Sequence, residues 1–243
     1  LVNRTPTVDS VTLPQDVTAE TTSILCDATG SDLDGETPTL TYAWTVGGVA
    51  HSEASDTLTD TFVYGDAIEC TVTSADAMET GSSMTATTTV LNTVPVVDSV
   101  TMSPSTVYTN DTITATAVLS DVDASQSLSA NFEWFVDGSS VQNGSWNTLD
   151  GASMFDRDES VYVEVTPYDG VADGTPVQSS AITISNTAPV MTSVTVTPNP
   201  AIAGTDDLIC DVTATDADGD AVVYTYEWSD SSGVQQTMTE VSD

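Results

Sequence analysis

The stretch Asn92-Thr93-Val94-Pro95-Val96-Val97-Asp98-Ser99-Val100-Thr101 indicates a repeated architecture, because closely similar stretches begin at Asn3 and at Asn186. The copies lie about 90 residues apart. Three tryptophans follow the same spacing: Trp44, Trp134 and Trp228. A fixed period of this length is typical of an array of similar small domains.

These spacings predict the domain organisation. We expect residues 1–3 to be the tail of a preceding repeat, 4–94 to form repeat one and 95–188 to form repeat two. Residues 189–243 would be the N-terminal part of repeat three. We expect either that the chain continues past Asp243, which is the simpler interpretation, or that another molecule supplies the missing strands.

Each repeat carries short segments in which apolar and polar residues alternate. Ile24, Cys26 and Ala28 are expected on one face of a second strand, and the two-residue spacing of Tyr42 and Trp44 puts both on one face of a third. About seven such strands, separated by turn residues, predict an antiparallel β-sandwich. No segment has a helical period. The expected fold class is all-β: tandem antiparallel immunoglobulin-like β-sandwiches, with the third incomplete.

The charge of the chain restricts its partners and its environment. Its 37 acidic residues face only Arg4 and Arg157, which gives a net charge of −35. Such a surface repels nucleic acids and anionic membranes, and no apolar stretch is long enough to cross a bilayer. It also repels itself unless cations screen or bind it. We therefore expect an extracellular or cell-surface location, with no nucleic-acid partner and no direct membrane insertion.

The motifs of residues 186–228 carry a family resemblance. Asn-Thr-Ala-Pro, Ser-Val-Thr-Val-Thr-Pro, Leu-Ile-Cys-Asp-Val-Thr-Ala-Thr-Asp-Ala-Asp-Gly-Asp and Tyr-Thr-Tyr-Glu-Trp follow one another there. This pattern resembles the tandem immunoglobulin-like, PKD-like and cadherin-like repeats of large bacterial surface proteins. The resemblance implies an extracellular scaffold, often adhesive and often calcium-bound.

The cysteines extend the resemblance. The order Cys26, Trp44, Cys70 resembles the immunoglobulin-like pattern, in which a disulfide joins the two sheets and packs on the indole. This implies a Cys26–Cys70 disulfide, and the alternative is two buried free thiols. Ala115 and Val163 take these positions in repeat two, which indicates that they belong to the core. Cys210 matches Cys26.

Acidic loops are the one feature with metal chemistry. Alternating carboxylates around a turn provide the hard oxygen ligands that Ca²⁺ needs, although Asp and Gly are also ordinary turn residues. In a sandwich, the loop after the second strand and the loop before the last strand lie at the end where the linker enters. Packed there without a cation, their carboxylates would repel one another and their pKa values would rise. The candidate structural calcium ligands are Asp32, Asp34, Glu36, Asp76, Asp121, Asp123, Asp169, Asp173, Asp216, Asp218 and Asp220.

We expect no enzymatic activity. His51, the single histidine, lies just past the third strand of one repeat only, and a row of narrow sandwiches offers no concave cleft for a carboxylate pair.

Three functions fit these features. The first is a repeat segment of a long extracellular stalk or adhesin, stiffened by calcium at domain junctions and contacting neighbouring repeats of the same chain. The second is a self-assembling subunit of an extracellular filament, sheath or surface layer, contacting identical chains. The third, ranked lower, is a carbohydrate-binding accessory module, for which Trp146 is the only tryptophan outside the core pattern.

Overall fold

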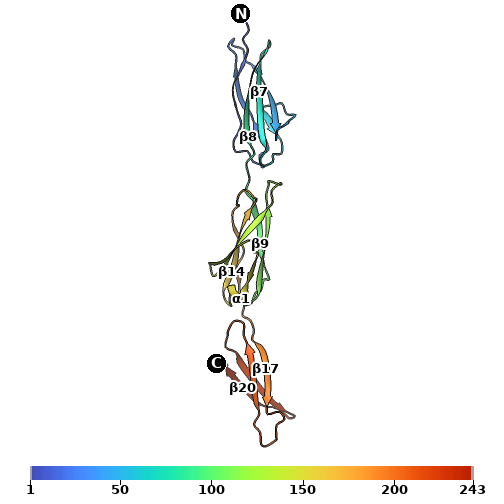
Figure 1. The fold of residues 1–243 in the computed structure, drawn as a ribbon, viewed down its shortest axis with the longest axis vertical. Helices are drawn as coiled ribbons and strands as arrows, with labels where there is room; N and C mark the ends of the chain where they lie inside the picture. Colours follow the sequence, from blue (N-terminus) through green and yellow to red (C-terminus); the bar gives the residue numbers. More distant parts are fainter. Residues whose placement is uncertain (1, 242–243) are drawn as a thin grey trace. The chain divides into compact units, whose positions relative to one another are not determined.

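The protein, described by a computed structural model over residues 2–241, consists mainly of antiparallel strands (Figure 1). It contains two compact units. The first comprises residues up to Asp98 together with Leu119–Ser129 and Thr166–Thr175, and the second comprises the remainder. Because the division falls inside repeat two, the boundaries at 94/95 and 188/189 stay a prediction.

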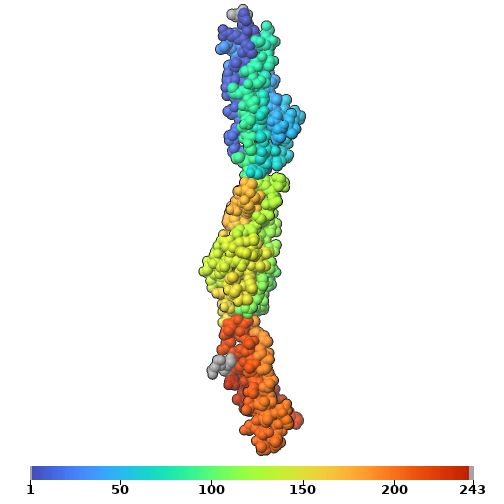
Figure 2. Space-filling model, viewed as in Figure 1, coloured from blue at the N-terminus to red at the C-terminus, as the bar shows by residue number. Residues whose placement is uncertain are grey.

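Repeat one lies wholly in the first unit. Its larger sheet has the strand order β5-β4-β7-β8, and two pairs, β1-β3 and β2-β6, complete the sandwich. In Figure 2 the blue atoms of β1 lie directly beside the cyan-green atoms of β8. The bounds are β1 (Thr7–Thr12), β2 (Ser23–Leu25), β3 (Asp27–Ser31), β4 (Thr39–Val46), β5 (Val49–Ala50), β6 (Thr57–Thr59), β7 (Ala67–Ala75) and β8 (Thr80–Thr89).

The core of repeat one is built on period-two alternation. Along β7, Ile68, Cys70 and Val72 are all fully buried, because successive side chains of a strand point to opposite faces. Trp44 of β4 stands opposite Cys70 and is only 1% exposed. Its indole N–H donates to the Ser55 carbonyl oxygen at 2.9 Å, which satisfies the one polar atom of this buried side chain.

The second strand of repeat one differs from our prediction. Residues 24–28 do not form one strand, because the chain changes partner at Cys26: β2 pairs with β6, whereas β3 pairs with β1. Between them, the Cys26 N–H donates to the Asp56 carbonyl oxygen at 2.8 Å. The segment therefore passes from one strand pair to another while Ile24 and Cys26 stay buried.

Repeat two shows the same plan. One sheet has the order β13-β10-β9, and the other has β12-β11-β14-β15, with β16 also paired to β14. Trp134 is fully buried, and its indole N–H donates to the Trp146 carbonyl oxygen at 3.1 Å. The bounds are β9 (Val96–Ser103), β10 (Thr112–Ser120), β11 (Ser129–Val136), β12 (Ser139–Gly144), β13 (Thr148–Asp150), β14 (Ser160–Tyr168), β15 (Val177–Gln178) and β16 (Ile182–Thr183).

One helical turn, α1 (Gly151–Met154), interrupts the strands, although the sequence predicts no helix. Asp150 caps it by accepting the Ala152 N–H at 3.1 Å, a local interaction that no periodic pattern reveals. No helix within residues 2–241 has the length and apolar character needed to span a bilayer.

Repeat three contributes two strand pairs to the second unit: β17 (Val190–Thr197) with β18 (Ile209–Thr215), and β19 (Val223–Asp230) with β20 (Gly233–Val241). Trp228 is half-buried. It lines a groove of about 320 Å³ together with Val194 and Val196, which are 57% and 42% exposed.

Candidate functional site

The acidic loops bind the linkers that enter each repeat. In all three repeats, one carboxylate oxygen of the loop's second aspartate accepts a backbone N–H from the linker. These bonds run from Arg4 to Asp34 Oδ2 at 2.6 Å, from Thr93 to Asp123 Oδ2 at 2.7 Å and from Thr187 to Asp218 Oδ2 at 2.6 Å. We call this contact the linker clamp.

The first aspartate of each loop shapes the turn that presents the clamp. Its Oδ1 accepts the N–H of the second aspartate at 2.7–2.9 Å in Asp32, Asp121 and Asp216, a typical Asx turn. Gly35 and Gly219 follow with φ of 85° and 75°, the left-handed conformation that glycine adopts without strain. Repeat two has alanine at this position.

A second acidic loop reaches the same linkers. In repeat one, Asn3 Nδ2 donates to Asp76 Oδ2 at 3.0 Å and to Glu79 Oε1 at 3.1 Å. In repeat two, Asn92 Nδ2 donates to Asp169 Oδ2 at 2.9 Å. Carboxylates from both loops therefore meet at the linker, as the fold predicts.

At Asp76 and Asp169 the pKa is lowered by hydrogen bonds, whereas we expected packed carboxylates to have raised pKa values. The Asn3 amide, followed by the backbone N–H groups of Glu79 and Met78, lowers the pKa of Asp76. Burial acts to raise the pKa of Asp169, but N–H donors from Ala172, Asn92 and Val171 outweigh it and the net shift is downward. Donors that favour the charged form thus exceed the mutual repulsion of the carboxylates at these positions.

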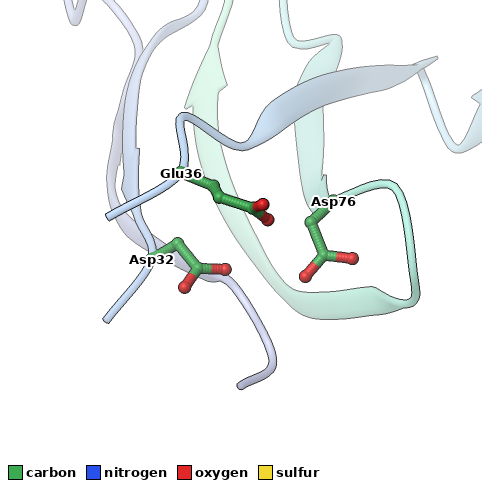
Figure 3. A group of neighbouring side chains, drawn as sticks. All are labelled: Asp32, Glu36 and Asp76. Carbon is green, nitrogen blue, oxygen red and sulfur yellow. The ribbon is translucent and has the colours of Figure 1, made fainter. Parts of the chain in front are cut away.

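In repeat one the carboxylates of the two loops face each other. Each of Asp32, Glu36 and Asp76 offers an oxygen, and these oxygens lie within 4.8 Å of one another. Figure 3 shows the three side chains converging from opposite loops. Asp32 Oδ2 is buried and has no hydrogen-bond partner among the described residues.

Repeat two holds its acidic groups more deeply. Asp123 is 2% exposed and Asp169 3%. Asp123 Oδ1, Asp121 Oδ2, Gln126 Oε1 and Thr93 Oγ1 are all buried, and each lacks a hydrogen-bond partner within residues 2–241. The Gln126 amide donates to Asn92 Oδ1 at 2.6 Å, which ties this loop to the linker asparagine.

Repeat three combines its carboxylates with a cation. Oxygens of Asp216, Asp218 and Asp220 lie within 4.8 Å of one another. Arg157, from the segment between α1 and β14, donates through Nη1 to Asp220 Oδ2 and, at 2.8 Å, to Asn186 Oδ1. The charge and hydrogen bond of Asp220 raise the pKa of Arg157.

One predicted ligand lies apart from these groups. Asp173 is exposed, and it corresponds to Thr80 of repeat one rather than to Glu79. The ligands predicted from the sequence do not include Glu79, Gln126 or the linker asparagines. The recurrence of asparagine three residues before each linker proline, at Asn3, Asn92 and Asn186, is the signal that could have revealed their role.

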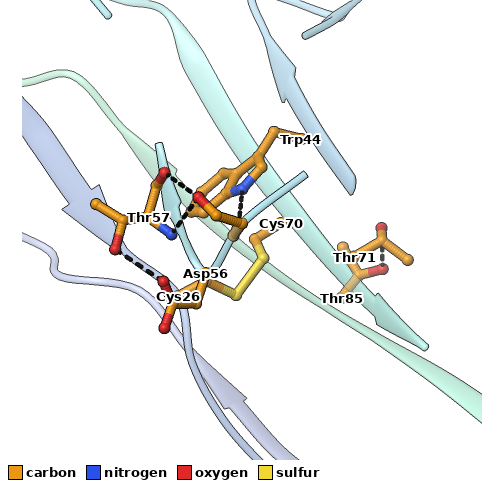
Figure 4. Close-up of a disulfide and its surroundings, with 8 residues drawn as sticks. Cys26, Trp44, Asp56, Thr57, Cys70, Thr71 and Thr85 are labelled. Atoms are coloured by element: carbon orange, nitrogen blue, oxygen red, sulfur yellow. Dashed lines mark hydrogen bonds between the residues drawn. A yellow bond between two sulfur atoms is a disulfide. The ribbon is translucent and has the colours of Figure 1, made fainter. Parts of the chain in front are cut away.

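The cysteine pattern corresponds to a disulfide. Cys26 and Cys70 are bonded, with their Cα atoms 6.5 Å apart, and the bond lies beside the Trp44 indole (Figure 4). Ala115 and Val163, at the matching positions of repeat two, are fully buried. Cys210 is a free, half-buried cysteine.

Comparison with known proteins gives no family. No family model matches the chain, and no curated protein matches its sequence. A two-domain fibronectin type III segment of chicken tenascin is similar in fold, with 8% identity, a TM-score of 0.39, and coverage of 72% of this chain and 98% of that one. Sidekick-1 immunoglobulin domains 1–5 match at 11% identity and a TM-score of 0.45, covering 98% of this chain and 50% of that one.

A viral structure is similar in the same range. Three N-terminal domains of the highly immunogenic outer capsid protein of bacteriophage RB49 show 16% identity and a TM-score of 0.35, covering 74% of this chain and 70% of that one. At such low similarity no residue can be assigned a role by analogy. The function must therefore be argued from the acidic loops.

Proposed function

We propose that this chain is a structural repeat segment of an extracellular stalk or adhesin in which calcium at acidic loops holds linkers in place. The observation that carries the proposal is Asp123. Its carboxylate is 2% exposed, one oxygen clamps the Thr93 N–H, and the other has no partner among the described residues. A buried anionic oxygen without a partner is costly, and a bound cation removes that cost.

The oxygen atoms available in repeat two suit a hard cation. Asp121 Oδ2, Gln126 Oε1 and Thr93 Oγ1 are, like Asp123 Oδ1, buried oxygens without a hydrogen-bond partner in the described part of the chain. Ca²⁺ takes six to eight oxygen ligands in flexible geometry and accepts carboxylate, amide carbonyl and water oxygens together. In repeat one, Asp32, Glu36 and Asp76 offer the same chemistry.

The mechanical role follows from what the loops hold. The linker clamp and the linker asparagine tie the entering backbone to both acidic loops of a repeat. A cation bound to the remaining oxygens of Asp121, Asp123, Gln126 and Thr93 would fix this loop against the linker and so restrict the linker. The proline three positions after the asparagine, such as Pro95, already limits the backbone there.

The test is calcium titration of the full chain after chelation. Isothermal titration calorimetry should show binding in the range of extracellular modules, with Kd of about 10⁻⁴ to 10⁻³ M. Hydrogen exchange at residues 92–94 should slow when calcium is added. Magnesium at the same concentration should protect less, because it demands near-ideal octahedral geometry. Absence of both heat and protection would contradict the proposal.

Repeat three supports a second candidate, a self-assembling subunit. Val194, Val196 and Trp228 line a groove of about 320 Å³. Exposed apolar faces of this kind are typical of interaction sites. Electron microscopy and sedimentation velocity with and without calcium separate the two functions, because fibres favour assembly and monomers alone favour the stalk segment.

A further inference from the structure

We infer that Arg157 of repeat two is a built-in cation at the acidic loop of repeat three, where it offsets part of the negative charge and competes with a divalent ion. The inference rests on the proposed function, because it concerns which of the acidic loops bind metal. The three acidic loops then differ in what holds them: the loops of repeats one and two depend on a metal, whereas the loop of repeat three is held by an arginine.

Positive charge is scarce in this chain. Only Arg4 and Arg157 oppose 37 acidic residues. Arg4 takes part in the linker clamp through its backbone N–H, not through its guanidinium. Arg157, in contrast, places its guanidinium on Asp220 Oδ2 and on Asn186 Oδ1, so the side-chain charge of one of the two cations lies at the acidic loop.

The Arg157 guanidinium lies at the acidic loop of repeat three. Asp220 belongs to the group in which the oxygens of Asp216, Asp218 and Asp220 lie within 4.8 Å of one another. Because Arg157 Nη1 donates to Asp220 Oδ2, the guanidinium supplies positive charge where a divalent ion would.

The residue that precedes an acidic loop and the third position of that loop differ together between repeats. Tyr64 of repeat one corresponds to Arg157 of repeat two. The residues that follow them, Gly65 and Asp158, have left-handed φ angles of 86° and 68°. Their N–H groups donate to the carbonyl oxygens of Val90 and Ile184, each just after the end of a strand. Ser125 takes the place of Asp220 in the loop of repeat two. The arginine thus precedes a loop whose third position is acidic, and the tyrosine precedes a loop whose third position is neutral.

The resulting behaviour is a loop that is stable without metal and resists it. A divalent ion at Asp216, Asp218 and Asp220 must displace the guanidinium from Asp220 or share the site with it, and repulsion between the two cations weakens binding. Removing the arginine frees one Asp220 oxygen and lowers the positive charge at the loop. The loop should then bind calcium about tenfold more tightly.

The experiment compares calcium binding by the full-length wild type, Arg157→Gln and Ser52→Asp. The Ser52 variant is a matched control, because it also makes the chain more negative by one charge, at an exposed position far along the sequence from the acidic loops. Calorimetry after chelation should show an additional or about tenfold tighter calcium site in Arg157→Gln only. The double variant Arg157→Gln/Asp220→Asn should lose that gain.

The outcomes separate the two proposals. Calcium binding by the wild type tests the proposed function, and the difference between wild type and Arg157→Gln tests the inference. If wild type, Arg157→Gln and Ser52→Asp bind calcium alike, the inference is overturned while the proposed function stands. If only Arg157→Gln binds calcium, the inference stands and the proposed function fails. If no variant binds calcium, both are overturned.

A second measurement checks that Arg157→Gln folds. Circular dichroism should show the wild-type strand signal, and in chelator the repeat-three transition should fall to a lower temperature that calcium restores. A transition that falls and is not restored by calcium would show that Arg157 acts only through its hydrogen bonds and would overturn the competition with metal.

Discussion

The backbone N–H of Thr93 donates to Asp123 Oδ2 at 2.7 Å, while Oδ1 of the same carboxylate is buried and has no partner among the described residues. One oxygen thus holds the linker and the other remains available for a cation. Oδ2 of Asp34 and of Asp218 holds the linker in the same way in repeats one and three.

Asp121→Asn should weaken calcium binding at repeat two without releasing the linker. The variant keeps Oδ1 as acceptor for the Asp123 N–H but replaces the unpartnered Oδ2 by an amide nitrogen, which cannot bind a cation. We expect at least a tenfold loss of affinity at this site, measured by calorimetry. Asp173→Asn, at the exposed position, should bind calcium like the wild type, and an equal loss in both variants would argue against a site at Asp121.

Acid should release the linkers. The pKa values of Asp76 and Asp169 are lowered from the ordinary value of about 3.9, so their stabilising effect is fully present above about pH 4. It is lost as the pH falls through the lowered folded-state pKa. In chelator, the melting temperature should therefore decrease as the pH is lowered below 4.

Asp169→Asn provides the comparison for this pH effect. It should melt at a lower temperature than wild type at pH 7 and show a smaller further drop between pH 4 and pH 2. Asp16→Asn, on an exposed loop, should keep the wild-type profile. If the melting temperature of Asp169→Asn fell with pH as much as that of the wild type, this carboxylate would not contribute to the acid sensitivity.

The disulfide should stabilise repeat one without determining its fold. It closes a loop with a sequence separation of 44, which corresponds to about 4 kcal/mol in the chain-entropy treatment. Cys26→Ala/Cys70→Val imitates the buried Ala115 and Val163 of repeat two, so the strand signal should persist while the free energy of unfolding of repeat one falls by about that amount. Calorimetry with and without reductant measures this, and reductant should not affect the double variant.

Gly81 and Gly174 should not tolerate alanine. A Cβ at either position would lie 1.9 Å from the carbonyl oxygen of the linker proline, Pro6 or Pro95. Each substitution must therefore push the linker away from its repeat, at a cost of about 1–3 kcal/mol. Thermal unfolding should show the loss for both variants, and Thr80→Ala, an exposed neighbour, should change stability by less than about 0.5 kcal/mol. Unchanged stability in Gly81→Ala would show that the linker is not pressed against β8.

Much of the fold could be predicted because it depends on local pattern. Ile68, Cys70 and Val72 alternate with polar residues, and this alternation by itself specifies which face of β7 is buried. The 90-residue period places Trp44 and Trp134 in equivalent cores. The pattern did not reveal the break at Cys26 or the turn α1, because partner exchange and a single cap involve no periodicity.

The tandem sandwiches, their core faces and the acidic character of the loops can be predicted from the sequence alone, since each follows from spacing and residue type along one repeat. The role of each carboxylate oxygen depends instead on the folded structure. Asp123, Asn92 and Gln126 come together through contacts between segments far apart in the chain, and Arg157 meets Asp220 across 63 residues. Hydrogen-bond donors are directional and act over about 3 Å, so whether a carboxylate is clamped, neutralised or left open depends on coordinates that no repeat pattern contains.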